Sequence, residues 1–482
     1  MPPRAPDSDP GLDVIPMLIG GAWVEPARVY DVIDPYRHEP VWRAPVTAPS
    51  ELNDAIAAAV SAKAAIAAMP GYERAALLRR VGVLLRERTD HVAEVMARET
   101  GKALRDARAE VARSQDTIDL SAEEAIRIEG AHVPLDGSQM GAGKIAMMLR
   151  FPVGVVAGIT PFNAPFNLAC HKVAPAIAAG NAIVLKASPQ APMVVHELAK
   201  MFVDAGCPKG ALNVVYGAEA GPALVRDPRV DFVTFTGSSR VGADIKAASG
   251  LRRVALELGG NGPTIIAADA DIAQAAPICA RSAMRLAGQS CISVQTVHVH
   301  RSLYEPFLAA LVAGVKALKL GDPLDGATDV GTLIDENAAR RVESWIAEAV
   351  AQGARAMTGG KRHGAAIEPT VLANVNATMK VVCDEVFGPV VSVMPFDNID
   401  DVIAMISASN FGLQCGLFTR SIETAMHAIR TLRTGGVIVN GPSTWRTDQL
   451  PYGGIKDSGS GREGPRYAIR EMTDERLVVF NM

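Results

Sequence analysis

The 482-residue chain lacks any surplus of positive charge. Its 48 lysines and arginines are balanced by 52 aspartates and glutamates, which gives a formal net charge of −4. A protein that neutralises nucleic-acid phosphates needs a basic excess, so we expect no nucleic-acid partner. The chain also lacks any run of about 18 apolar residues, so we expect no membrane-spanning segment. Its 43 glycines and 31 prolines follow no period, which excludes a collagen-like chain.

Cysteine is scarce, and no two cysteines form a C-x-x-C pair. The six cysteines are Cys170, Cys207, Cys279, Cys291, Cys383 and Cys415. Their wide spacing argues against a zinc site or a disulfide framework, so we predict no bound metal and a reducing, cytoplasmic compartment. In such a compartment a cysteine can serve chemistry rather than structure. Residues 1–13 lack the features of a signal peptide and are predicted to form a flexible lead-in.

Short apolar strands alternate with amphipathic helices after residue 150. Four runs are typical of buried strands: Val153–Ile159, Ala182–Lys186, Ala211–Tyr216 and Asp231–Phe235. A second alternating series covers residues 263–439. This alternation predicts an α/β fold built on doubly wound, largely parallel sheets.

Helices, a hairpin and a terminal strand complete the pattern. Residues 50–102, interrupted at 69–71, and residues 105–130 have helical spacing of apolar residues. Residues 131–150 are predicted to form a hairpin or arm. The apolar run Arg476–Phe480 predicts an edge strand that needs a partner, in this chain or in a second subunit.

A glycine-containing turn is the first candidate for ligand binding. Gly237, Ser238 and Gly242 follow a predicted strand and open a predicted helix. Free backbone N–H groups and the helix dipole at such a position can bind an anion. The alternative is a tight turn without a ligand.

Three further residues are suited to catalysis. Glu257 stands alone in an apolar stretch, where burial would make it a stronger base. Cys291 follows Gly-Gln-Ser at the end of a predicted helix over 271–286, which is a polar setting for a core thiol. Asn163 lies between two prolines, and its amide could stabilise an oxyanion. The alternatives are a capping carboxylate, a buried core cysteine and a turn-forming asparagine.

Together these segments resemble the aldehyde dehydrogenase superfamily over residues 19–480. The motif E-L-G-G-N begins at Glu257 and the motif G-Q-x-C ends at Cys291, and both are intact. The segments 385–389 and 451–464 also match family motifs. The resemblance implies a cofactor-binding domain, a catalytic domain with its own largely parallel sheet, and a small β oligomerisation arm.

The resemblance also implies boundaries and an assembly. We expect a homodimer or homotetramer. The expected units are the cofactor-binding domain at 1–130 and 151–257, the arm at 131–150, the catalytic domain at 258–439, a return segment at 440–469 and an oligomerisation strand at 470–482.

By this resemblance Cys291 is the nucleophile that forms a thiohemiacetal with the aldehyde. Asn163 and the backbone N–H of Cys291 hold the oxyanion. Glu257 activates the water that hydrolyses the thioester. Because members that pass the acyl group to coenzyme A typically lack this glutamate, we expect release of a free carboxylate.

The resemblance places the following residues around NAD or NADP: Ile159, Thr160, Pro161, Phe162, Lys186, Ser188, Pro189, Gly237, Ser238, Gly242, Leu258, Glu385 and Phe387. One departure concerns the adenosine end. After Lys186 the chain reads Ala-Ser-Pro, without the glutamate that many NAD-using members place on the ribose 2′-hydroxyl. The sequence is therefore compatible with either NAD or NADP. In the case of NADP, Ser188 or Arg240 could contact the 2′-phosphate.

Arginines are the clue to the aldehyde. Arg285 matches the arginine that succinic semialdehyde dehydrogenases use for the distal carboxylate, and Arg446 lies in a segment resembling related semialdehyde dehydrogenases. Arg108 could converge on the same pocket, which Phe162 and Ser290 would also line. We expect a short aldehyde with an anionic far end. The alternatives are a neutral aliphatic or aromatic aldehyde, and a non-catalytic member of the family.

Overall fold

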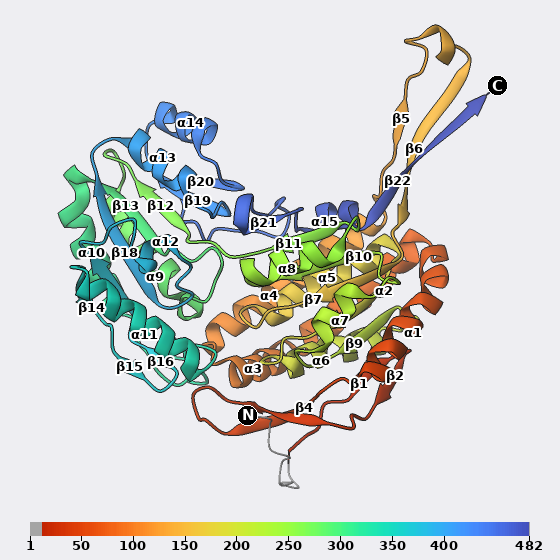
Figure 1. Ribbon diagram of the computed structural model, residues 1–482, viewed down its shortest axis with the longest axis horizontal. Helices are drawn as coiled ribbons and strands as arrows, with labels where there is room; N and C mark the ends of the chain where they lie inside the picture. The colour runs from red at the N-terminus through yellow and green to blue at the C-terminus, as the bar shows by residue number, and fades with distance from the viewer. Residues whose placement is uncertain (1–11, 482) are drawn as a thin grey trace.

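The computed structural model describes residues 12–481 (Figure 1). Most of the predicted lead-in, residues 1–11, lies outside the described part. Two large sheets with their helices and a projecting three-stranded arm make up the fold. The predicted class, α/β with two largely parallel sheets and a small β arm, is confirmed.

The first sheet has eight strands, and its central five are parallel. In spatial order the strands are β2 (Ala22–Val24), β1 (Met17–Ile19), β9 (Leu212–Val215), β8 (Ala182–Lys186), β7 (Val155–Ile159), β10 (Phe232–Thr236), β11 (Val254–Glu257) and β21 (Gly459–Ser460). Its helices are α1 (Pro49–Ala68), α2 (Gly71–Glu87), α3 (Thr89–Thr100), α4 (Leu104–Ala125), α5 (Pro165–Ala179), α6 (Pro192–Asp204), α7 (Ala220–Arg226) and α8 (Ser239–Ser249).

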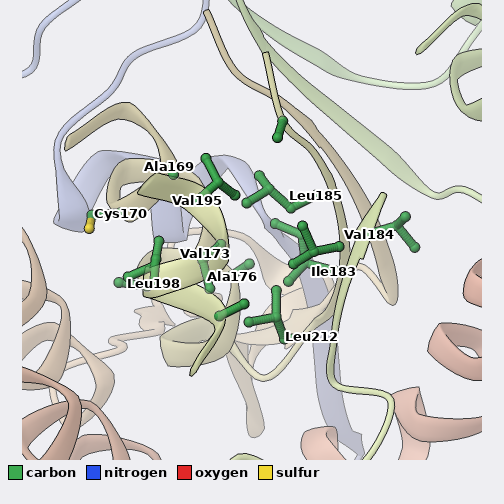
Figure 2. Packing of buried hydrophobic residues seen from close by; sticks show 14 of the residues in the cluster. Ala169, Cys170, Val173, Ala176, Ile183, Val184, Leu185, Val195, Leu198 and Leu212 are labelled. Carbon is green, nitrogen blue, oxygen red and sulfur yellow. The ribbon is translucent and has the colours of Figure 1, made fainter. Parts of the chain in front are cut away.

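The core of this unit follows from local sequence. All five residues of β8 are buried, as expected for a parallel strand covered on both faces. Helix α5 begins with Pro165 at a position where a missing N–H costs nothing, and it ends at Gly180 with φ +86°. Figure 2 shows apolar side chains from α5, β8 and α6 gathered into one cluster.

The second sheet has seven strands, of which only β14 runs antiparallel to its neighbour. In spatial order they are β14 (Arg355–Thr358), β17 (Thr370–Ala373), β18 (Val390–Phe396), β13 (Thr296–His300), β12 (Pro263–Ile266), β19 (Gln414–Phe418) and β20 (Gly436–Val439). Its helices are α9 (Ile272–Met284), α10 (Tyr304–Lys316), α11 (Glu336–Ala351), α12 (Lys380–Cys383), α13 (Ile399–Ala408) and α14 (Ile422–Thr431).

The arm projects from the first unit (Figure 1) and consists of β5 (Ala131–Val133), β6 (Lys144–Pro152) and β22 (Thr473–Asn481). Strand β22 pairs with β6 along its whole length, from Thr473 opposite Pro152 to Asn481 opposite Lys144. The C-terminal strand was predicted to need a partner in this chain or in a second subunit, and along this edge the partner is β6 of the same chain. The outer edge of β22 has no strand partner among the described residues.

The chain returns from the second sheet to the first near its end. After β20 it crosses back, and β21 pairs antiparallel with β11. Helix α15 (Pro465–Glu471) follows and leads into β22. This return segment ties the two sheets together beside the loops that end β11 and precede β13.

Two small sheets, β3 (Val29–Ile33) with β4 (Pro40–Pro45) and β15 (Arg362–His363) with β16 (Ala366–Ile367), complete the structure. Within residues 12–481 no single helix is long and apolar enough to cross a membrane. Helices α1 and α2 reach the necessary length and apolar composition only when taken together, and the chain bends by 115° between them.

Candidate active site

A cavity of about 360 Å³ opens where the two sheets and the return segment meet. Cys291 lines it from the loop before β13, and Glu257 lines it from the end of β11. Asn163, from the turn between β7 and α5, and Tyr452, from the return segment, line the same cavity. Segments far apart in the sequence are thus brought together at one place.

The loop that presents Cys291 is fastened from both sides. Helix α9 ends at Met284 rather than near 286, because Arg285 leaves the helical region with ψ 141°, and Leu286 and Ala287 then adopt left-handed φ angles of 55° and 51°. The side chain of Gln289 then bridges the loop to the 332–334 segment: its Oε1 accepts the Ile334 N–H at 2.9 Å. Its Nε2 donates to the carbonyl of Leu286 at 3.2 Å. The glutamine of G-Q-x-C therefore holds the backbone before the thiol.

The Cys291 thiol lies 3.1 Å from the hydroxyl of Tyr452. Burial raises the pKa of the Cys291 thiol to about 12, although the Tyr452 hydrogen bond acts in the opposite direction. All six cysteines are free. Cys291 alone among them lines the cavity.

Asn163 is held in a rigid turn. Its Nδ2 donates to the carbonyl oxygen of Gln289 at 3.0 Å, so the amide lies against the cysteine loop. The first turn of α5 directly after it is fixed by Glu110, whose Oε1 accepts the N–H groups of Phe166 and Asn167, each at 3.0 Å. A carboxylate at a helix N-terminus is favoured by the helix dipole.

Glu257 is buried with no hydrogen bond to either carboxyl oxygen within residues 12–481. Burial and the nearby Glu463 raise the pKa of Glu257 well above its ordinary value, against the opposing effects of Arg446 and Lys172. A carboxylate in such a place takes up a proton readily.

Arg446, Glu463 and Lys172 form a cluster of buried charged side chains beside the cavity. Arg446 donates to Glu463 at 2.7 Å, and Lys172 lies 3.9 Å from the same carboxylate. Burial would raise the pKa of Glu463, but His171, Arg446 and Lys172 outweigh it and hold that pKa below its ordinary value. The sequence prediction missed Glu463 and Lys172, although a lysine inside the largely apolar α5 was a visible signal.

The predicted arginines have three different fates. Arg285 lines the cavity, with its Nε 3.4 Å from Asp106 Oδ1. Arg446 also lines the cavity, but its charge is committed to Glu463 and its side chain is only 7% exposed. The prediction for Arg108 is wrong: its helix turns it outward, where it pairs with Asp90 at 2.9 Å outside the cavity lining.

Arg113 occupies the place that Arg108 was expected to fill. It lies on the inner face of α4, lines the cavity, and donates to Asp448 at 2.8 Å and to Asn167 at 3.0 Å. The heptad-like spacing of α4 could have distinguished the two faces, because Arg113 and Arg108 differ by five residues. Ser290 and Phe162, both predicted, line the cavity as well.

The other end of the cavity has the character of a dinucleotide site. Phe162 and Phe387 meet edge to face, with ring centroids 5.9 Å apart. Glu385 Oε1 accepts the Gly260 N–H at 3.2 Å, and burial raises the pKa of Glu385 to about 7. Pro161, Gly237, Ser238 and Leu258 complete the predicted residues in this part of the lining.

Close packing at this end depends on glycine. A Cβ at Gly259 would lie 2.5 Å from Glu385 Oε2, and one at Gly242 would lie 2.5 Å from a methyl carbon of Leu258. Ser238 caps α8 by accepting the Val241 N–H at 3.4 Å. A helix N-terminus next to such a cradle fits the pyrophosphate of a nicotinamide dinucleotide.

Gly242 lies in α8, outside the cavity lining. The remaining predicted cofactor residues also lie outside it, at the carboxyl ends of β7 and β8: Ile159, Thr160, Lys186, Ser188 and Pro189. Burial lowers the pKa of Lys186 to about 8. Ser188 Oγ donates to Gln190 Oε1 at 2.9 Å, and the Pro189 carbonyl accepts the Tyr30 hydroxyl at 2.9 Å. Carboxyl ends of parallel strands are where α/β sheets bind nucleotides.

Comparison with known proteins gives the family. The sequence matches the model of the aldehyde dehydrogenase family over residues 23–478. It is 45% identical over 469 residues to a 3-sulfolactaldehyde dehydrogenase from Priestia aryabhattai, covering 97% of this chain and 98% of the relative.

Two solved structures are also similar. Aldehyde dehydrogenase 21 from Physcomitrella patens, in complex with the reaction product succinate, superposes with a TM-score of 0.95 at 37% identity, covering 97% of this chain and 98% of that one. An NADP-dependent glyceraldehyde-3-phosphate dehydrogenase from Bacillus halodurans, complexed with NADP, gives 0.94 at 33% identity, with 97% and 99% covered. The chain therefore belongs to the aldehyde dehydrogenase family. It is an enzyme that oxidises aldehydes with NAD or NADP.

Proposed function

We propose that this enzyme oxidises a short aldehyde with an anionic group at its far end to the free carboxylate. The observation that carries the proposal is the presence of Arg285 and Arg113 in the lining of the cavity that holds Cys291 and Glu257. Guanidinium groups suit carboxylate, sulfonate or phosphate oxygens through paired hydrogen bonds. The names of the relatives, which include sulfolactaldehyde and glyceraldehyde-3-phosphate dehydrogenases, support the same class.

In the proposed reaction the Cys291 thiolate attacks the aldehyde carbon and forms a thiohemiacetal. The Asn163 amide and the backbone N–H of Cys291 donate to the oxygen that gains negative charge. Asn163 Nδ2 donates to the carbonyl oxygen of Gln289, two residues before Cys291, which places the amide beside the cysteine loop.

The oxidised product leaves by hydrolysis. When bound, the nicotinamide ring supplies the acceptor for the hydride that leaves the substrate carbon. Glu257 then takes a proton from the water that attacks the resulting thioester, and the carboxylate product and the Cys291 thiolate separate. Burial without a partner equips Glu257 for this step.

The dinucleotide would be held along the edge of the first sheet. Glu385 would bind the nicotinamide ribose, with Phe162 and Phe387 beside the ring. Gly237, Ser238 and Gly242, with Leu258 beneath, would receive the pyrophosphate at the start of α8. The adenosine end would be held by Ile159, Thr160, Pro161, Lys186, Ser188 and Pro189, where no carboxylate discriminates between NAD and NADP.

A neutral aldehyde is the second candidate, because each cavity arginine already has a carboxylate neighbour. Asp106 lies 3.4 Å from Arg285, and Asp448 lies 2.8 Å from Arg113. Charges offset in this way attract a further anion less strongly.

For the assembly we propose a homodimer or homotetramer joined through the arm. Strand β22 presents an unpaired outer edge within the described part of the chain, together with the exposed apolar side chains Leu477, Val479 and Phe480. An apolar edge strand of this length is normally covered by a partner.

The test is reduction of NAD and, separately, of NADP with succinic semialdehyde, glyceraldehyde-3-phosphate, lactaldehyde, benzaldehyde and hexanal, with Cys291→Ala as control. We expect the acid-bearing aldehydes to have the highest kcat/KM and the control to be inactive. Preference for lactaldehyde, benzaldehyde or hexanal would refute the anionic substrate class and establish the second candidate.

A further inference from the structure

The hydroxyl of Tyr452 touches the proposed nucleophile, yet no step described so far uses it. Resting on the proposed role of Cys291, we infer that Tyr452 is a further catalytic residue. Its hydroxyl donates a hydrogen bond to Cys291 Sγ and stabilises the thiolate that attacks the aldehyde and later leaves the thioester.

The contact is held on a rigid frame. Tyr452 is 5% exposed, and its ring packs with Ile292 and Leu413. Its backbone is bonded in both directions to Glu463, with the Tyr452 N–H donating at 3.1 Å and the carbonyl accepting at 2.6 Å. The hydroxyl therefore reaches Cys291 Sγ, 3.1 Å away, from a fixed position. A buried tyrosine hydroxyl usually has a hydrogen-bond partner, and Sγ is that partner here.

The surrounding charges favour a hydrogen bond in which the Tyr452 hydroxyl donates and Cys291 Sγ accepts. The Arg446 guanidinium carbon lies 3.7 Å from the centroid of the Tyr452 ring. Glu463 fixes this cation in place by accepting a hydrogen bond from it at 2.7 Å. A cation over the ring withdraws electron density from the phenol, which makes its O–H a better donor. The same cation favours negative charge on the sulfur.

This arrangement also gives Arg446 a function within the chain. The guanidinium that was predicted to bind substrate is instead shared between a carboxylate and an aromatic face. Arg446 is thus a positioning residue that acts on the nucleophile through Tyr452.

A thiolate needs such help at this place. Cys291 is partly buried and shares the cavity with Glu257 and Glu385, and both the burial and the two carboxylates disfavour a further negative charge on the sulfur. A hydrogen bond to a charged group changes an equilibrium by about tenfold to a hundredfold. A more stable thiolate is also a weaker nucleophile, because the logarithm of its attack rate falls by about half of the decrease in the thiol pKa. The net gain in attack rate is therefore about threefold to tenfold.

The experiment compares Tyr452→Phe with the parent protein and with Tyr304→Phe. Phenylalanine keeps the ring, its apolar contacts and the stacking of Arg446, and removes only the hydroxyl. Tyr304 is a matched control because it is also buried and does not line the cavity. Alkylation of Cys291 by iodoacetamide is followed from neutral to alkaline pH by mass spectrometry of its peptide, without aldehyde or dinucleotide.

We expect Tyr452→Phe to lower the alkylation rate at neutral pH by about threefold to tenfold, with a difference that narrows as pH rises and more of both thiols ionises. Tyr304→Phe should match the parent. An equal or faster rate in Tyr452→Phe at neutral pH would overturn the proposal, since the hydroxyl would then be neutral or would accept from the thiol. The result is independent of the aldehyde class, so failure of the substrate proposal and failure of this one are distinguishable.

Discussion

The substrate proposal makes its sharpest prediction at Arg285, because the chain offers a matched control on the neighbouring helix. Arg285 and Arg108 are both partly exposed, and each is paired with an aspartate. Only Arg285 lines the cavity. Replacement of each by alanine removes the same charge and the same number of atoms, inside the cavity in one case and outside it in the other.

The size of the effect follows from the surroundings of Arg285. A hydrogen bond to a charged group contributes about 1.5–3 kcal/mol when it is well buried. The Arg285 side chain is 44% exposed and lies 3.4 Å from Asp106, so solvent and the aspartate reduce its contribution. We therefore expect a loss of about 1–2 kcal/mol, which is about fivefold to thirtyfold in kcat/KM for an anionic aldehyde.

The assay measures kcat/KM for succinic semialdehyde and for butanal, an uncharged aldehyde of the same chain length. Arg285→Ala should lose activity with the first and keep it with the second, while Arg108→Ala should resemble the parent with both. Equal losses on the two aldehydes in Arg285→Ala would show that the side chain supports the fold of the cavity and does not bind the anion. If Arg108→Ala lost as much activity as Arg285→Ala, the conclusion that Arg285 binds the anion because it lines the cavity would be refuted.

Glu257→Gln should still give a burst of one reduced dinucleotide per site in stopped-flow absorbance. Its steady-state rate should fall by about a hundredfold or more, because hydrolysis of the thioester loses its base. An unchanged steady-state rate would refute the role of Glu257 as that base. In the parent the steady-state rate should rise with pH, because burial and Glu463 raise the pKa of Glu257 and only its deprotonated form accepts a proton. Gly260→Ala should lower kcat by about a hundredfold, because the new Cβ would lie 2.5 Å from the carbonyl oxygen of Cys291 and displace its backbone. Gly326→Ala, where a Cβ meets nothing within 4 Å, is its control, and similar kcat values for the two variants would contradict the reasoning.

Local sequence was sufficient for much of the fold. The strand at 182–186 was predicted to the residue, because four consecutive apolar residues precede Lys186 at its end. The helix predicted to continue to 286 ends at 284, since Arg285 takes an extended conformation and the two non-glycine residues after it take left-handed ones that no sequence signal reveals.

The residues of the site were likewise predicted in part and missed in part. Side chains carried by a distinctive motif lie in the cavity lining, as Cys291 and Glu257 do. Interactions between distant segments were missed, because a contact such as Tyr452 with Cys291 joins residues 161 positions apart. Arg108 was misplaced because its position was inferred from a nearby motif, whereas the spacing of buried residues in α4 separates its face from that of Arg113.

The position of the return segment has a consequence for the time during which the protein is made. On the ribosome, the cysteine loop is synthesised 161 residues before its tyrosine partner. At ordinary rates of translation of about 5–20 residues per second, this interval is about 8–32 s. Strand β21, the buried carboxylate Glu463 and strand β22 emerge later still. The nascent chain therefore carries its thiol without the groups that surround it, and the pocket closes only when the last tenth of the polypeptide has been released.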